Sequence, residues 1–176
     1  MNRPETTSTT EQIRLERRLP SYWRVTFDIP PLNIFGPKEI PQLDEIITAI
    51  ETDQHVKVVV FDSAVEGFFL THYDFLAPLE DSTRIPPGRT GLQALPDMLA
   101  RLSRAPVVSI ASIRGRATGV GSELALASDM RFASREKGGP FAMGGRRGSR
   151  ARWRPNGAIA APDRPRSGAG SAAELQ

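Results

Sequence analysis

The sequence predicts an α/β domain in which amphipathic helices alternate with buried strands. Residues 37–53 place apolar side chains at helical spacing, and the β-branched run VKVVVFD follows at 56–62. Such a run is typical of a parallel strand that is buried on both faces. The same unit then recurs, because a leucine-rich helix that ends at Pro106 precedes a second apolar run, PVVSIAS. Two successive helix–strand units favour a parallel sheet covered by helices.

The chain before the first helix divides into a polar leader and a strand. Residues 1–20 form the leader, in which we expect only a short helix around EQIRLERRL. The segment SYWRVTFDIP alternates between apolar and polar residues, which predicts an edge strand at 22–29, ended by Pro30 and Pro31. In the helix that follows, the apolar residues are Ile40, Leu43, Ile46, Ile47 and Ile50, and Pro41 blurs the start of the helix.

The second helix–strand unit begins after a long connection. APLEDSTRIPPGRTG, at 77–91, is rich in Pro and Gly and predicts a loop. The leucines of the next helix fall on one face: Leu92, Leu95, Leu99 and Leu102. After the second buried strand, RATGVGSELALASD predicts a glycine turn that opens a third helix, and DMRFAS predicts a short strand.

Cysteine and histidine usage argues against a metal or disulfide framework. The chain has no cysteine, and its two histidines, His55 and His72, do not have metal-ligand spacing. We therefore expect no metal. There is no apolar run of membrane-spanning length, and the first residues are too polar for a secretory signal. We expect a cytoplasmic protein with no membrane partner.

The positive charge belongs to the C-terminal tail. The formal net charge of +3 would by itself favour a search for nucleic acid, but residues 1–137 carry −2 and residues 138–176 carry +5. In this tail, 27 of 39 residues are Gly, Ala, Arg or Pro. Such a segment buries too little apolar area to offset its ordering entropy, so we expect it to be disordered and to have no specific nucleic-acid partner.

Two loops follow the two buried strands, EGFFLTHYDF at 66–75 and RGRATGVGSEL at 114–124. In parallel α/β architectures ligands collect beyond the carboxyl ends of strands, so we expect both loops to face one crevice. Gly119 and Gly121 allow unusual backbone dihedrals, and the helix that they open has unpaired N–H groups and a positive dipole end, which suits an anion or a developing oxyanion. Glu123 has a simpler interpretation, as an acid that complements this dipole, and Asp129 is expected to cap a turn or open the next strand.

The segments FLTHYDF, RAPVVSIASIRG and RATGVGSELALASDMRFAS, in this order after VKVVVFDSA, resemble the enoyl-CoA hydratase/isomerase (crotonase) family. The order and spacing hold across about residues 22–137, which is roughly the N-terminal half of that family's domain. The resemblance implies the family's repeated ββα superhelix, incomplete at its C-terminus. It divides the chain into a leader at 1–20, a crotonase-like core at 21–137 and the tail at 138–176.

The resemblance also implies roles for single residues. The family's first-loop pattern falls on residues 69–75, so the backbone N–H of Tyr73 and that of Val120 are the expected oxyanion donors. The family usually has Gly at the positions of His72 and Val120. The neighbouring residues expected to bind substrate are His72, Asp74, Gly119 and Gly121. We expect His72 to be a loop residue rather than a catalyst, and Asp74 is equally consistent with a simple turn acid.

Glu123 falls on a glutamate that, in hydratases of the family, works with a second glutamate as general acid and base. The resemblance implies an acyl-CoA substrate, a homo-oligomer and no cofactor apart from the coenzyme A of the substrate. The second glutamate would follow DMRFAS, but no acid stands between Glu136 and Asp163. The family's oligomers also depend on C-terminal helices that the tail does not resemble. The acyl chain and the exact reaction are not specified by these residues.

A frameshift would explain the abrupt change at Gly138, because codons made only of G and C encode Gly, Ala, Arg and Pro. Translation of the encoding DNA in the other two frames tests this hypothesis, which fails if neither frame resumes a family-like sequence. Two alternatives to the enzyme stay open. One is a truncated, catalytically inactive crotonase-like fragment. The other is a dinucleotide-binding α/β domain, although Leu124 stands where the third glycine of GVGSEL belongs.

Overall fold

A computed structural model of the chain describes residues 11–134. The expected disorder and the hypothesised frameshift of residues 138–176 lie outside this part. The main sheet has five strands in the order β1-β2-β3-β5-β7. Their bounds are β1 Ile13–Leu19, β2 Tyr22–Phe27, β3 Val58–Ser63, β5 Val108–Ile113 and β7 Met130–Ala133. β1 pairs antiparallel with β2, and the other neighbours are parallel, as the buried β-branched runs predict.

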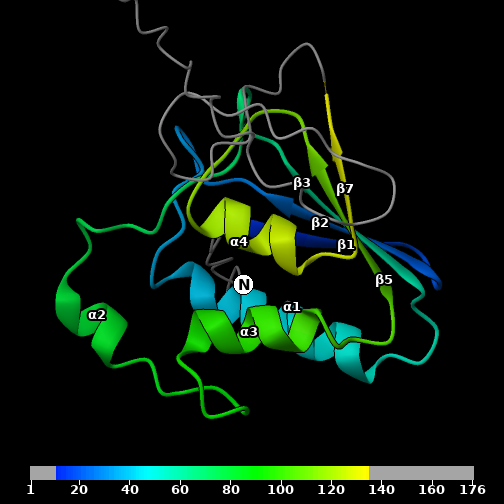
Figure 1. The fold of residues 1–176 in the computed structure, drawn as a ribbon, viewed down its shortest axis with the longest axis horizontal. Helices are drawn as coiled ribbons and strands as arrows, with labels where there is room; N and C mark the ends of the chain where they lie inside the picture. Colours follow the sequence, from blue (N-terminus) through cyan, green and yellow to red (C-terminus); the bar gives the residue numbers. More distant parts are fainter. Residues whose placement is uncertain (1–10, 135–176) are drawn as a thin grey trace, which may run out of the picture. The chain divides into compact units, whose positions relative to one another are not determined.

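Three helices pack near this sheet, α1 (Glu39–Thr52), α3 (Ala94–Leu102) and α4 (Val120–Ala127). Figure 1 shows α1 and α3 side by side, with α4 nearer to the strands. The buried residues of α1 include all five isoleucines and leucines expected on its apolar face. Pro41 lies in the first turn of α1, where its missing N–H has no intrahelical acceptor to lose. These helices confirm the predicted helix–strand alternation.

Four local predictions are wrong. Leu92, expected on the apolar face of the leucine-rich helix, lies before the first residue of α3 (Ala94–Leu102) and is 47% exposed. Residues 13–19, expected within the polar leader and near a short helix, form β1, because Ile13 and Leu15 point to the core side while charged residues alternate with them. β2 is consequently an interior strand and not an edge strand. The loop at 77–91 contains a short helix, α2 (Leu79–Thr83).

A second, smaller sheet pairs β4 (Phe68–Leu70) with β6 (Arg116–Ala117) in parallel. β3 and β4 therefore precede α2 and α3, and β5 and β6 precede α4, which gives the predicted ββα repeat. Aromatic side chains join the two sheets in the core. The ring of Phe69 on β4 meets Phe27 on β2 edge-on at 6.2 Å between centroids, and Phe27 stacks with Phe61 on β3 at 6.4 Å.

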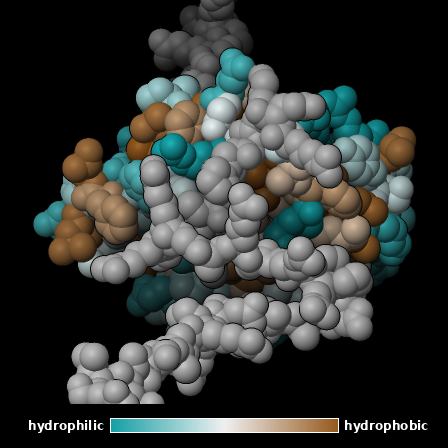
Figure 2. Space-filling model, turned by 45° about the horizontal axis from the view of Figure 1, so that its top comes forward, coloured by the Kyte–Doolittle hydropathy of each residue, from teal (hydrophilic) through white to brown (hydrophobic). Residues whose placement is uncertain are grey.

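Some large hydrophobic side chains of the described residues reach the surface. Phe75 is 81% exposed, Leu76 96% and Leu79 73%, and all three belong to the segment around α2. Figure 2 shows hydrophobic residues interspersed with hydrophilic ones on one face of the molecule. No helix among the described residues is long and apolar enough to span a bilayer.

Candidate functional site

The two loops expected to share a crevice are joined by backbone hydrogen bonds. The N–H of Thr118 donates to the carbonyl oxygen of Leu70 at 3.2 Å, and the N–H of Gly121 donates to that of Thr71 at 3.1 Å. These bonds continue the parallel pairing of β4 with β6. The start of α4 is thereby held against the segment that leads into Tyr73.

Both glycines of the turn permit this close approach. Gly119 has φ +50°, and a Cβ on it would lie 2.9 Å from Cα of His72. A Cβ on Gly121 would lie only 1.9 Å from the carbonyl oxygen of Leu70. Gly121 is buried, and its N–H is donated to the carbonyls of Thr71 and Thr118. Gly121 therefore has a packing role in the structure, and its expected contact with substrate stays a prediction.

The expected donor Tyr73 lies in an isolated parallel bridge with Phe35. Phe35 donates to the carbonyl of His72 at 3.2 Å and accepts from the N–H of Asp74 at 2.8 Å. In such a parallel bridge, Phe35 bonds to the two residues that flank Tyr73. The N–H and C=O of Tyr73 itself then point away from Phe35. The N–H of Tyr73 is therefore turned away from Phe35, and no acceptor for it occurs among the backbone hydrogen bonds of residues 11–134.

The expected donor Val120 is the first residue of α4, and Gly119 precedes it as the N-cap. First-turn N–H groups have no intrahelical acceptor. In the described part of the chain, the N–H of Val120 likewise has no backbone acceptor. The two segments contact each other through Gly119, Gly121 and residues 70–72. Each therefore carries one amide N–H that has no backbone acceptor among residues 11–134.

Glu123 lies in the first turn of α4 and is exposed. Its N–H donates to the carbonyl of Gly119 at 3.0 Å, and its carboxylate forms no ion pair within residues 11–134. Both interpretations of this side chain, a proton-transfer group and a complement to the helix dipole, fit this position.

His72 and Asp74 flank Tyr73 and make local bonds. The imidazole of His72 is exposed, lies 2.7 Å through Nδ1 from the carbonyl oxygen of Tyr73, and stacks on Phe75 with 6.1 Å between ring centroids. Asp74 accepts the N–H of Leu76 at 2.9 Å. This bond fits the simpler prediction for Asp74, an acid that stabilises a turn.

Asn33, which no sequence pattern marked as a site residue, supports the segment that leads to Tyr73. Asn33 is fully buried with φ +53°. Its side chain accepts from the N–H of Ile29 at 2.8 Å and donates to the hydroxyl of Ser63 at 2.8 Å and the carbonyl of Phe69 at 2.5 Å. Its own carbonyl accepts the N–H of Thr71 at 2.9 Å. The only available signal was a lone amide residue in the apolar turn PPLNIF.

Asp129 anchors the other end of α4, as the turn-cap prediction requires. Its carboxylate accepts the N–H and the hydroxyl of Ser109 at 2.8 and 2.7 Å. These hydrogen bonds hold the pKa of Asp129 below its ordinary value, and the bond from the Ser109 N–H has the largest effect. Two residues later, Arg131 donates to the carbonyls of Ala125 and Ser128 at 2.9 and 2.8 Å and so caps the C-terminus of α4.

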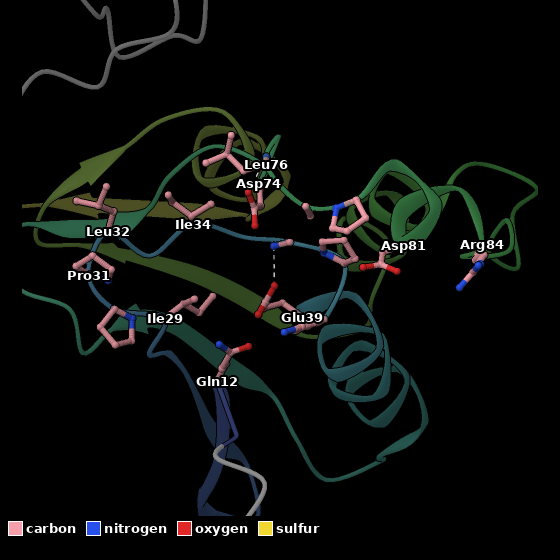
Figure 3. Close-up of a pocket in the computed structure, with 16 residues that line it drawn as sticks. Gln12, Ile29, Pro31, Leu32, Ile34, Glu39, Asp74, Leu76, Asp81 and Arg84 are labelled. Carbon is pink, nitrogen blue, oxygen red and sulfur yellow. Dashed lines mark hydrogen bonds between the residues drawn. The ribbon is translucent and has the colours of Figure 1, made fainter.

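A groove of about 980 Å³ lies beside Asp74, between residues 29–39 and residues 74–84. Apolar residues dominate one wall, and the opposite wall comes from the start of the segment that carries α2. Figure 3 shows the carboxyl groups of Asp74 and Glu39 turned toward one another, with the Gly36 N–H donating to Glu39 at 2.6 Å. The lining includes Ile29, Pro31, Leu32, Ile34, Lys38, Leu76, Asp81 and Arg84. It adjoins the amide pair at Asp74 but does not include Tyr73, Val120 or Glu123.

Residues 21–144 match the profile of the enoyl-CoA hydratase/isomerase family. The chain belongs to this family. The family match favours the crotonase-like interpretation of GVGSEL over dinucleotide binding, and solved structures of such proteins superpose on this fold. Among residues 11–134, no group of three His, Cys, Asp or Glu side chains is placed to hold a metal.

Individual members of the family are similar to this chain over the same region. The mouse mitochondrial enoyl-CoA hydratase domain-containing protein 2 is 36% identical over 102 residues, which are 58% of this chain and 34% of that protein. A carnitinyl-CoA dehydratase from Salmonella arizonae is 33% identical over 123 residues, 68% of this chain and 44% of that one. A crystal structure of a putative enoyl-CoA hydratase from Streptomyces avermitilis superposes with a TM-score of 0.66 at 27% identity, covering 72% of this chain and 47% of that one. The chain thus matches less than half the length of each of these proteins.

Proposed function

We propose that the chain acts on an acyl-CoA thioester, with the N–H groups of Tyr73 and Val120 as donors to the thioester carbonyl oxygen. That oxygen gains negative charge when an enolate forms, and preorganised backbone donors stabilise such charge at little reorganisation cost. The positive end of α4 adds to the effect at Val120. Glu123, in the first turn of the same helix, is the proposed acid and base.

The observation that carries the proposal is the contact between the two loops. Gly121 donates to Thr71, and Gly119 packs on His72, so the donors stand next to these contacts on each side. Donor groups on two separate loops are useful to a single oxygen atom only if the loops are held together.

Turnover of crotonyl-CoA by the full 176-residue chain tests this proposal. The loss of ultraviolet absorbance of the conjugated thioester reports hydration, and calorimetry reports binding. We expect Glu123→Gln to lower turnover on the order of 100-fold while Kd changes by less than about 3-fold, because the carboxylate moves a proton and the amides bind the substrate. The matched control is Glu45→Gln, an exposed glutamate on α1, which should keep the wild-type rate.

A second candidate function is acyl-CoA binding without turnover. It is favoured by the lack of an acid between Glu136 and Asp163, where hydratases of this type would need their second carboxylate. Binding by the wild-type chain with no turnover supports this candidate. Absence of both binding and turnover contradicts both candidates, and equal rates for the wild type and Glu123→Gln contradict the role of Glu123.

A further inference from the structure

His72 occupies the junction of the two loops. Its Cα lies 2.9 Å from the position of a Cβ on Gly119, so its side chain leaves the backbone beside the start of α4. The imidazole is exposed, and it is held by stacking on Phe75 and by the contact of Nδ1 with the carbonyl of Tyr73. These two contacts orient the exposed ring in the structure.

The contact with Tyr73 also fixes the tautomer of His72. A carbonyl oxygen only accepts hydrogen bonds, so Nδ1 must carry the proton in the 2.7 Å contact. In the neutral ring, Nε2 then holds the free electron pair. No partner for Nε2 occurs among the hydrogen bonds of the described residues.

The same contact places the ring at the edge of the Tyr73 donor. The N–H and C=O of one extended residue point to the same edge of a strand. The bridge with Phe35 turns this edge of Tyr73 away from Phe35. An imidazole bound to the Tyr73 carbonyl therefore lies beside the N–H that is proposed to hold the thioester oxygen.

We infer that His72 is a second proton-transfer residue, in addition to Glu123, and that its Nε2 serves as the general base. The inference rests on the proposed function. It supplies the second proton-transfer group that the segment between Glu136 and Asp163 lacks.

The assigned chemistry for hydration uses both groups. Nε2 takes one proton from water while the water oxygen bonds to C3 of the enoyl group. The electron pair of the C2–C3 double bond shifts so that the thioester oxygen becomes the enolate oxygen, held by the two amides. Glu123 in its acid form gives its proton to C2, and the enolate electrons form the new C–H bond. The imidazolium then returns a proton to the Glu123 carboxylate through solvent, which restores both groups.

Nuclear magnetic resonance of the ¹⁵N-labelled full chain tests the geometry without substrate. The chain has only two histidines, so His55→Gln and His72→Gln assign both rings. In the neutral form of the ring, we expect the proton of His72 to be on Nδ1. A proton on Nε2 overturns the inference.

Kinetics with crotonyl-CoA test the role. We expect His72→Gln and His72→Gly to lower turnover on the order of 100-fold with nearly unchanged Kd, and free imidazole in the buffer to restore part of the rate of His72→Gly only. His55→Gln is the matched control, because it removes an exposed histidine beyond α1.

The outcomes separate this inference from the function on which it rests. Wild-type turnover that depends on Glu123 but not on His72 overturns only the inference. Faster turnover by His72→Gly than by the wild type also overturns the inference, because it would mean that the imidazole obstructs the site. A wild-type chain that neither binds nor turns over the thioester overturns the proposed function, and the role of His72 with it.

Discussion

The N–H of Gly121 donates to the carbonyl oxygen of Thr71 at 3.1 Å and so fastens the start of α4 to the segment that ends in Tyr73. The two residues are far apart in the sequence, but the β4–β6 pairing brings them together. On each side of this bond stands one amide, that of Tyr73 or Val120, with no backbone acceptor in the described part of the chain. The proposed chemistry depends on this pair.

Removal of the Val120 N–H without loss of the helix is possible because Val120 is the first residue of α4. Proline is well tolerated at that position, where the N–H has no intrahelical acceptor. We expect Val120→Pro to lower crotonyl-CoA turnover about 100- to 1000-fold, the usual effect of losing one oxyanion donor.

Val120→Ala is the matched control for this change. It trims a buried side chain, so it should destabilise the fold by about 1–3 kcal/mol, but it keeps the N–H and should keep most of the turnover. Equal activity of the proline and alanine variants, with folding verified by circular dichroism, contradicts the role of this amide.

Close packing at Gly119 predicts a stability effect. Gly119→Ala places a Cβ 2.9 Å from His72 Cα on a backbone with φ +50°, so both strain and crowding oppose it. Gly91→Ala is the control, because Gly91 has φ +82° but no atom within 4 Å of its Cβ position. In urea unfolding, we expect Gly119→Ala to cost about 1–3 kcal/mol more than Gly91→Ala. Similar costs would mean that the loops are not in close contact.

Asn33 should be more important for stability than its place in a turn suggests. Asn33→Ala removes three side-chain hydrogen bonds. It also leaves alanine at φ +53°, where no side-chain hydrogen bond compensates for the backbone strain. We expect a loss of about 3 kcal/mol in the free energy of unfolding. Asn33→Gly relieves the backbone strain and should be about 1 kcal/mol less destabilising than Asn33→Ala. An alanine variant as stable as the wild type is the contradicting result.

Asp129 predicts a pH dependence of stability. Its pKa is lowered in the folded chain, chiefly by the Ser109 N–H, so the stabilisation is present above the unfolded carboxyl pKa of about 3.9 and is lost as pH falls through the lower folded value. Asp129→Asn should therefore reduce the free energy of unfolding at neutral pH, with a deficit that is constant above about pH 5 and shrinks in acid. Asp81→Asn, which removes an exposed carboxylate on α2, is the control. A deficit that persists unchanged in acid would contradict the assignment.

Periodicity and β-branched runs predicted most of the main sheet and its helices. The apolar positions of α1 and the run of β3 are local signals, and each was sufficient to identify its element. The strand β1 was missed because its charged residues concealed the alternation of Ile13 and Leu15. The strands of the small sheet span only three and two residues, too few to show any period.

The candidate site residues stay predictions, and the contacts that support them in the structure could not be read from the sequence. Glycines and a helix-start acid mark the turn before α4 in the sequence, and the resemblance supplied Tyr73. The hydrogen bonds of Asn33 and the direction of the His72 ring depend on contacts between distant segments, which no local pattern encodes. The packing of Gly121 against Leu70 was not predicted, because it is likewise a long-range contact.

The central claim is that the amides of Tyr73 and Val120 bind one oxygen. It is tested most directly by titrating the ¹⁵N-labelled full chain with butyryl-CoA, a saturated thioester that has no double bond to hydrate. We predict that the amide protons of Tyr73 and Val120 shift downfield together and saturate with the same Kd. Saturable binding that leaves both amides unshifted, or that shifts only one of them, would contradict the account.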